Sequence, residues 1–116
     1  MKENLIVKKT FEFSLDIIEL YKQLTEKKEF ILSKQLFRSG TSIGANVREA
    51  TAGQTKKDFI TKMAIASKEA RETLYWLQLL QQSQLIAGDY TRYISTADEI
   101  VKILTSIVKT AQKSNN

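Results

Sequence analysis

The sequence predicts an all-α fold, an antiparallel up-down-up-down bundle of four helices, within one domain that spans residues 1–116. Apolar residues recur at alternating spacings of three and four along four long segments. The chain has no proline and only four glycines, so few positions interrupt a helix. Short polar stretches separate the segments, and short connections favour antiparallel neighbours.

The first predicted helix covers residues 4–26. Its apolar residues, among them Phe13, Ile17 and Leu20, form a broad face of the kind that a helix buries in a bundle. The polar stretch 25–29 is the predicted turn to the next helix.

The second predicted helix, residues 30–51, contains the unusual stretch RSGTSIGAN at 38–46. Glycine, serine, threonine and asparagine disfavour a helix interior, so local chemistry alone indicates a loop. A heptad-like spacing of apolar and small residues nevertheless continues through the stretch, and we therefore predict a helix. Gly40 and Gly44 would let a neighbouring helix come very close, and packing must offset the roughly 0.5–1 kcal/mol that each glycine costs.

Turn and capping residues separate the last two predicted helices, residues 56–82 and 89–112. Gly53 is the predicted left-handed residue after the second helix. Thr55 is the predicted N-cap of the third helix, and Asp89 that of the fourth.

The residue types that are missing limit the chemistry. Without cysteine there is no disulfide, thiolate metal site or thiol nucleophile, and without histidine the commonest metal ligand and general base are missing. The spacing of Gly40 and Gly44 lacks the Lys-Ser/Thr of a phosphate-binding loop. Glu69 and Glu72, with Arg71 between them, do not have metal-ligand spacing. We expect no enzymatic activity, no metal and no cofactor.

The charge balance allows two kinds of partner. The chain has 18 basic and 13 acidic residues, a formal net charge of +5. This excess is compatible with RNA or DNA binding through counterion release, and equally with simple solubility. Clustering of the basic residues on one face of an oligomer would favour nucleic acid, whereas scatter or pairing with carboxylates would favour a protein-protein adaptor. The candidate nucleic-acid-binding residues are Lys8, Lys9, Lys56, Lys57 and Lys62.

Polar side chains interrupt the apolar faces of the second and third predicted helices. A buried polar group left unpaired costs about 1–3 kcal/mol, so these residues need partners. The favoured interpretation is an internal network, such as Arg38 or Asn46 with Glu69 or Glu72, that fixes helix register. The alternative is a polar interface or ligand groove. The candidate network residues are Arg38, Ser39, Asn46, Glu49, Glu69 and Glu72.

Apolar surface beyond the needs of one core predicts self-association. Tyr75 and Trp76 are adjacent, so they cannot both lie on one narrow face. In the fourth predicted helix, Tyr93, Ile100 and Ile107 belong to a second apolar strip beside the first. The candidate oligomer-interface residues are therefore Tyr75, Trp76 and Tyr93.

No segment has the length and hydrophobicity of a signal peptide or of a membrane span, which needs ~20 apolar residues. We expect a cytoplasmic protein without a membrane partner.

The sequence QLFRSGTSIGANVREA at 35–50, followed by TKKDF at 55–59, resembles the four helix bundle protein family. This group contains proteins encoded in intervening sequences of bacterial 23S ribosomal RNA genes and is sometimes labelled S23 ribosomal protein. The sequence KEARETLYWL at 68–77 is similar to the family's third-helix signature, and the resemblance covers essentially the whole chain.

This resemblance implies an antiparallel four-helix bundle that assembles into a ring-shaped homopentamer. A relative with this fold is the accessory variability protein of diversity-generating retroelements. That relative binds nucleic acid through basic surfaces and has a reverse transcriptase as its partner, so the resemblance implies nucleic-acid binding and a reverse-transcriptase-like partner for this chain.

Overall fold

The computed structural model describes residues 2–114, with side chains from residue 5 onward. Residues 1, 115 and 116 of the predicted domain lie outside this range. The described residues form four helices, each within two residues of its predicted bounds. They are α1 (Lys2–Glu26), α2 (Leu32–Thr51), α3 (Lys56–Ser83) and α4 (Thr91–Lys113).

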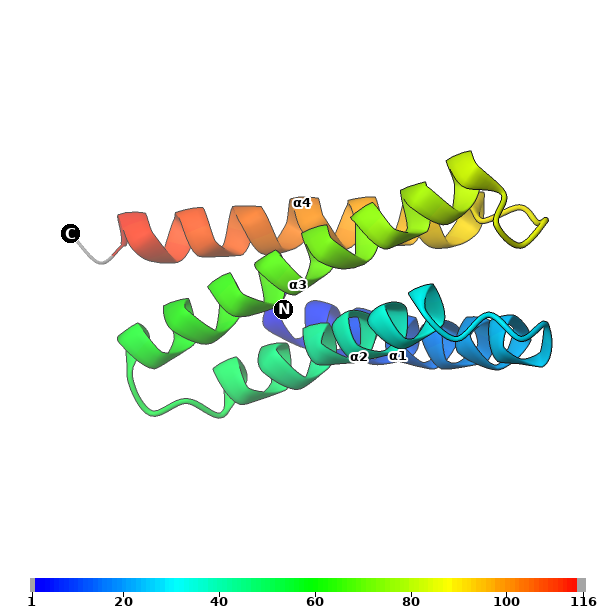
Figure 1. Ribbon diagram of the computed structural model, residues 1–116. Helices are drawn as coiled ribbons and strands as arrows, with labels where there is room; N and C mark the ends of the chain where they lie inside the picture. The colour runs from blue at the N-terminus through cyan, green and yellow to red at the C-terminus, as the bar shows by residue number, and fades with distance from the viewer. Residues whose placement is uncertain (1, 115–116) are drawn as a thin grey trace.

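Consecutive helices run in opposite directions along a bundle that measures 49 × 22 × 21 Å (Figure 1). α2 packs between α1 and α3, whereas α4 packs mainly on α3 and also contacts α1. The predicted antiparallel up-down-up-down bundle is confirmed. Within the part of the chain that the structure describes, no helix is long and apolar enough to cross a membrane.

The core face of α4 differs from the predicted one. Tyr93, Ile100 and Ile107, which we placed in a second strip, are at most 7% exposed and belong to the core. Ile94 and Val101, on the strip beside it, are only partly buried. Both strips repeat every seven residues and lie side by side on the helix. Their spacing alone therefore does not reveal which strip faces inward.

The small residues of α2 bring it close to α1. A Cβ atom at Gly40 would lie 2.8 Å from Cγ2 of Ile17, and one at Gly44 would lie 3.2 Å from the carbonyl oxygen of Thr10. Contacts this short leave no room for a side chain at Gly40. The predicted helix across this stretch and the predicted close approach of a neighbouring helix are both confirmed.

The helix ends follow the sequence only in part. Thr55 caps α3 as predicted, because its hydroxyl accepts a hydrogen bond from the Asp58 N–H at 3.0 Å. The prediction for Gly53 is wrong, since its φ angle is not positive; among the described residues, the left-handed positions are Lys28 and Gln84. The prediction of Asp89 as the N-cap of α4 is wrong, because Tyr90 occupies that position. The Asp89 carboxylate nevertheless accepts a hydrogen bond from the Thr91 N–H, and contacts with Thr91 lower the pKa of this carboxyl.

An acidic residue before α2, which the sequence analysis missed, organises the start of that helix. The Glu29 carboxylate accepts hydrogen bonds from the N–H groups of Ile31, Leu32 and Ser33 at 2.7–3.0 Å. The Ser33 hydroxyl donates to the Glu29 carbonyl at 2.8 Å. These bonds satisfy N–H groups that have no partner within the helix, and the negative charge suits the positive end of the helix dipole.

Replacing Gly40 with alanine should destabilise the protein by about 1–3 kcal/mol, because the added methyl group overlaps Ile17 in a packed core. Urea denaturation at one protein concentration measures the effect. Ala45→Gly, at an exposed position of the same helix, gives the cost of glycine alone, about 1 kcal/mol. If Gly40→Ala instead stabilised the protein by a similar amount, helix propensity would outweigh packing and this account would be wrong.

Candidate nucleic-acid and partner interfaces

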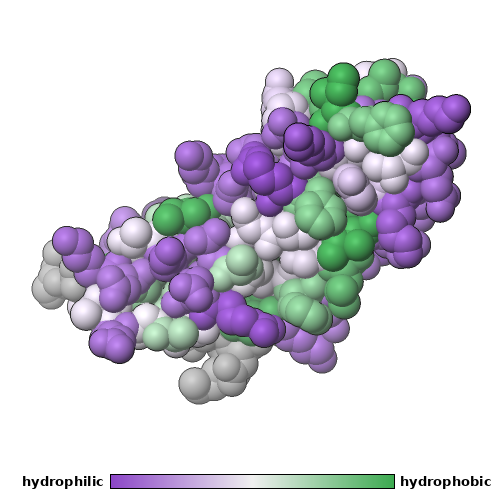
Figure 2. All heavy atoms as spheres, turned by 60° about the horizontal axis from the view of Figure 1, so that its bottom comes forward, coloured by the Kyte–Doolittle hydropathy of each residue, from purple (hydrophilic) through white to green (hydrophobic). Residues whose placement is uncertain are grey.

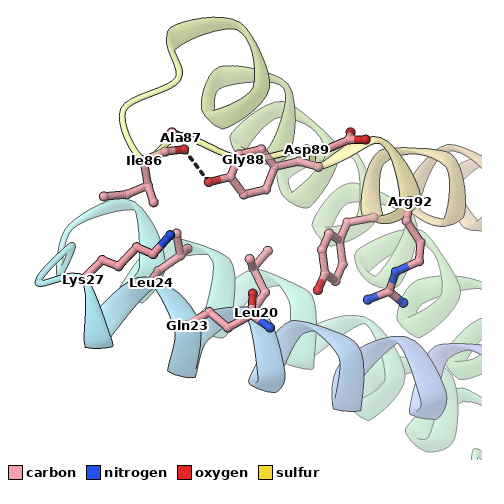
Figure 3. Close-up of a pocket in the computed structure, with 11 residues that line it drawn as sticks. Leu20, Gln23, Leu24, Lys27, Ile86, Ala87, Gly88, Asp89 and Arg92 are labelled. Carbon is pink, nitrogen blue, oxygen red and sulfur yellow. Dashed lines mark hydrogen bonds between the residues drawn. The ribbon is translucent and has the colours of Figure 1, made fainter.

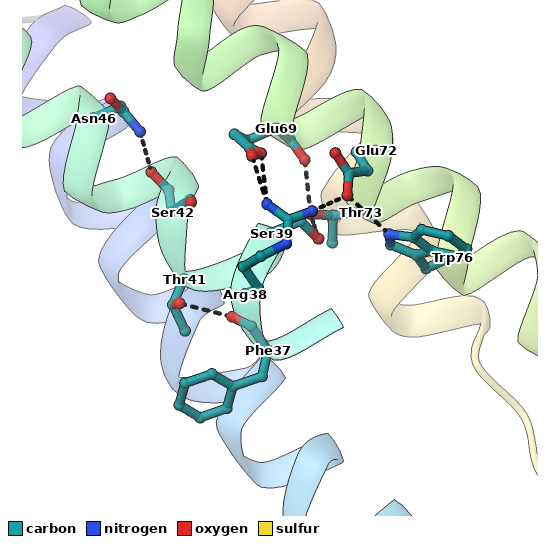
Figure 4. Close-up of polar contacts among 10 residues, drawn as sticks. All are labelled: Phe37, Arg38, Ser39, Thr41, Ser42, Asn46, Glu69, Glu72, Thr73 and Trp76. Atoms are coloured by element: carbon teal, nitrogen blue, oxygen red, sulfur yellow. Dashed lines mark hydrogen bonds and ion pairs between the residues drawn. The ribbon is translucent and has the colours of Figure 1, made fainter. Parts of the chain in front are cut away.

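A cationic side chain from α2 joins two carboxylates on α3 (Figure 4). The Arg38 guanidinium donates a hydrogen bond to Glu69 at 3.1 Å and forms a second ion pair with Glu72. Trp76 donates its indole N–H to the same Glu72 carboxylate at 3.2 Å. Glu69 and Glu72 are three residues apart, so they lie on one side of α3 and one guanidinium reaches both.

The contact lies at the surface, which differs from the internal network that we predicted. The Arg38 side chain is 52% exposed, whereas that of Glu69 is 12% exposed. Exposed ion pairs typically contribute about 0.2–1 kcal/mol, because water screens them. The arrangement can hold α2 in register with α3, and it leaves part of the guanidinium accessible.

The other predicted network residues do not take part in the contact between Arg38 and the two glutamates. Ser39 is buried and accepts a hydrogen bond from the Thr73 hydroxyl at 2.9 Å, across the same helix pair. Asn46 donates to the Ser42 carbonyl within α2 and reaches neither glutamate. Glu49 is exposed near the end of α2. Thr73 was missed, although it lies three residues after one core residue of α3 and four before the next.

The three predicted interface aromatics have different environments. Tyr75 is 55% exposed and packs edge-to-face against Trp76, with ring centroids 5.3 Å apart. Trp76 is partly buried against the core. Tyr93 is 7% exposed, so its placement at an oligomer interface is wrong: its ring lies inside the protomer. Tyr75 therefore offers the most accessible ring of the three.

The predicted basic residues of α1 are not both free. Lys8 is exposed, whereas Lys9 is half-buried and forms an ion pair with Glu99 of α4 at 2.8 Å. This pair joins the first and last helices and neutralises the charge of Lys9 within the protomer. Only Lys8 of the two keeps its charge available to a partner.

The predicted basic residues of α3 lie close to the end of α4. Lys56 and Lys57 are exposed in the first turn, and the Lys56 ammonium donates a hydrogen bond to the Ser114 hydroxyl. Lys62 is half-buried. Ser114 directly follows α4, so this contact joins the start of α3 to the end of α4, which carries further lysines.

Those lysines, which the sequence analysis missed, line a shallow hollow of about 450 Å³ along α4. Lys102, Lys109 and Lys113 follow one another at spacings of seven and four, so they share one side of the helix. The hydroxyl residues Thr105 and Thr110 line the same hollow. Lys102 is paired with Asp98 at 3.0 Å. In the sequence, the spacing of seven and four between these lysines is the pattern that could have revealed that they share one side of α4.

Charge is distributed unevenly between the two ends of the bundle. We define the basic end as residues 5–12, 45–62 and 98–114. The turn between α2 and α3 and the end of α4 lie at the left in Figure 1, and the start of α1 lies nearer the middle. It carries nine basic and five acidic residues, whereas the remainder, residues 13–44 and 63–97, carries eight and seven. The basic members are Lys8, Lys9, Arg48, Lys56, Lys57, Lys62, Lys102, Lys109 and Lys113.

Apolar side chains remain exposed along the outer groove between α1 and α2. Phe11 and Leu15 are 50% and 53% exposed and line a hollow of about 300 Å³ that reaches Thr41. Thr41 also lines the next hollow, of about 530 Å³, with Tyr21 and Phe37. Figure 2 brings this side of the molecule forward, and hydrophobic surface gathers there between hydrophilic patches. We call this surface the α1–α2 groove.

Among the described residues, no group of three or more acidic side chains could together hold a metal ion.

The Arg38 contact can be tested by a double-mutant cycle. Arg38→Ala and Glu72→Gln should show a coupling energy of about 0.5–1 kcal/mol that decreases as salt is added, since partly exposed charges are screened. Urea denaturation at two salt concentrations measures it. Lys34→Ala, at an exposed position of the same helix, should leave the free energy of unfolding unchanged. A coupling energy of zero at low salt would mean that the pair does not hold α2 and α3 together.

Comparison with known proteins agrees with the fold. Residues 2–106 match the family model described as 23S rRNA-intervening sequence protein. A crystal structure from Bacteroides thetaiotaomicron, of a protein of unknown function from the S23 ribosomal protein family, is 50% identical in sequence. The alignment covers 94% of this chain and 99% of that chain, with a TM-score of 0.88. Among curated proteins, no match was found. The chain belongs to the 23S rRNA-intervening sequence protein family.

Proposed function

We propose that this protein is a non-enzymatic, self-associating binding protein that contacts the phosphate backbone of RNA or DNA through its basic end. The uneven distribution of charge carries the proposal: the basic end has an excess of four positive charges, and the rest of the described chain has an excess of one. When lysines neutralise phosphates, the nucleic acid releases its bound counterions. The local excess of positive charge at the contact surface therefore matters more than the net charge of the whole chain. We expect the protein to act in the cytoplasm.

The hollow on α4 supports this proposal in its chemistry. Lysine ammonium groups and hydroxyls are the donors that proteins commonly direct at phosphate oxygens, and both kinds line the hollow. Lys109 and Lys113 are four residues apart, about one helix turn or ~6 Å along α4, so their ammonium groups can reach neighbouring phosphates of one strand. Neither contact would distinguish one base from another, so we expect binding with little sequence preference.

The α1–α2 groove supports a protein partner, and we propose that this partner is another copy of the chain. Phe11 and Leu15 expose half of their surface, which a soluble monomer seldom leaves open in one continuous patch. The five-copy ring implied by the family resemblance fits such an assembly. A purely protein-directed adaptor, with no nucleic-acid partner, is the second candidate function, and the same groove favours it.

Removing the charges of Lys109 and Lys113 should weaken binding to structured RNA, single strands and duplex DNA alike. We expect the slope of log affinity against log salt to decrease in magnitude by about 2, because about one counterion is released per phosphate contact. Titrations of Lys109→Gln/Lys113→Gln at two salt concentrations measure this.

The matched control is Lys28→Gln/Lys68→Gln, which removes two exposed charges outside the basic end and outside the α1–α2 groove. If both double variants lost affinity equally, the basic end would have no special role. No binding of the unaltered protein at low salt would leave the adaptor as the function.

Light scattering tests self-association. The unaltered protein should be larger than a monomer at micromolar concentration, and Phe11→Glu/Leu15→Glu should be smaller because charge cannot be buried in an apolar contact. Leu85→Glu is the control, since Leu85 is equally exposed (57%) but lies in the connection between α3 and α4. A strict monomer for the unaltered protein contradicts the proposal, as does dissociation by Leu85→Glu alone.

A further inference from the structure

The end of the bundle at the right in Figure 1 exposes large apolar side chains in both of its connections. Phe30 and Ile31, in the turn between α1 and α2, are 61% and 78% exposed. Leu85, in the connection between α3 and α4, is 57% exposed. Connections between helices usually carry polar residues, so apolar side chains exposed in both connections at one end indicate a surface that meets a partner.

The two connections lie beside each other. Lys27, directly after α1, lines a cleft of about 290 Å³ together with Ile86 of the α3–α4 connection. Figure 3 shows this connection passing over the end of α1, with Ile86 above Lys27 and Leu24. The Tyr90 hydroxyl donates to the Ile86 carbonyl at 2.6 Å and holds the connection there. Leu85, the neighbour of Ile86 in the chain, therefore belongs to the same end surface as the α1–α2 turn.

Hydrogen bonds fix the turn that carries Phe30 and Ile31. The Glu29 N–H donates to the Leu24 carbonyl at 3.0 Å. The Glu29 carboxylate accepts from the N–H groups of Ile31 and Ser33 at 2.8 and 2.7 Å. The backbone is thus held on both sides of Phe30, and the exposure of the two side chains is a property of the fold. Neither side chain lines the hollows of the α1–α2 groove, so the pair lies outside the surface proposed for self-association.

The charges around these two side chains are mostly positive. Lys27, Lys28 and Lys34 are exposed, and none of them forms an ion pair with a described carboxylate. Glu26 is exposed too, whereas the carboxylate of Glu29 is buried against backbone N–H groups and does not face a partner. An exposed apolar pair with lysines before and after it in the chain is complementary to a partner that combines an apolar interior with a negatively charged outer layer.

We propose that this end of the bundle binds the surface of a membrane that contains anionic lipids. Phe30, Ile31 and Leu85 enter the boundary between headgroups and acyl chains, and the lysines around them remain among the lipid phosphates. A fluid bilayer accommodates projecting side chains without a matching pocket, which a protein partner would have to supply.

Such a contact needs no membrane-spanning helix, because an apolar surface can enter a bilayer from one side. It is therefore compatible with the finding that no described helix could cross a membrane. The expectation of no membrane partner rested on the lack of a span and of a signal peptide, and this surface gives reason to revise it. The surface lies outside the basic end, so its contact does not depend on the proposed nucleic-acid contact.

Co-sedimentation of the full chain with lipid vesicles tests this inference. Vesicles of phosphatidylcholine and phosphatidylglycerol in equal amounts are compared with vesicles of phosphatidylcholine alone. We expect saturable binding to the anionic vesicles and about tenfold weaker binding to the neutral vesicles, because lysines are attracted to an anionic surface. No binding to either vesicle at low salt would overturn the proposal and leave a protein as the partner of this surface.

Phe30→Ser and Ile31→Ser should each weaken binding to the anionic vesicles about tenfold, because each removes an apolar side chain from the bilayer. The matched control is Leu5→Ser, since Leu5 is equally exposed (59%) but lies near the start of α1. Circular dichroism checks that each variant is folded. An equal loss of binding with Leu5→Ser would contradict insertion of the α1–α2 turn.

Lys27→Gln/Lys28→Gln should weaken binding to the anionic vesicles about tenfold and leave binding to the neutral vesicles unchanged. The matched control is Lys56→Gln/Lys57→Gln, which removes another adjacent pair of exposed lysines, at the basic end. A larger loss with this control pair would place the lipid contact at the basic end and would overturn the proposal.

Discussion

The close approach of α2 to α1 at Gly40 and Gly44 is the constraint on which the surfaces of this protein depend. With Ile17 and the Thr10 backbone against these glycines, the two helices have little space between them for large side chains. Rings on the outer side meet across the groove instead. Tyr21 packs edge-to-face against Phe37 with centroids 4.9 Å apart, and Arg48 lies over the Phe11 ring at 5.3 Å. The close packing and the exposed aromatic groove thus have one cause.

The opposite side of α2 uses small polar residues for a different purpose. Ser39 is next to Gly40 but faces α3, where its hydroxyl meets that of Thr73 in a buried contact. A buried hydroxyl pair has a directional preference that an apolar contact lacks, so it favours one register of the two helices. Arg38 adds a second directional contact at the surface. α2 is therefore held by steric fit on one side and by hydrogen bonds on the other.

Much of this fold could be predicted from the sequence, because repeated apolar spacings over twenty or more residues indicate helices directly. The spacings did not reveal which of two strips on α4 faces inward, and the assignment of Tyr93 failed for that reason. Glu29 was missed because it reaches α2 from outside the helix through three backbone N–H groups. The availability of Lys9 depended on Glu99, ninety residues away in the sequence, which no local pattern reveals.

The positions of the proposed surfaces bear on how they would act together. Among the described residues, α4 contacts α3 and α1 but not α2, so copies that associate through the α1–α2 groove leave the lysine hollow of α4 uncovered. Within the basic end of one chain, Lys9 and Lys102 are engaged by carboxylates of their own protomer, which lowers the number of charges available to a nucleic acid. Several copies bound to one nucleic acid would raise the effective concentration of each further contact. Weak phosphate contacts on each protomer then suffice, provided that assembly comes first.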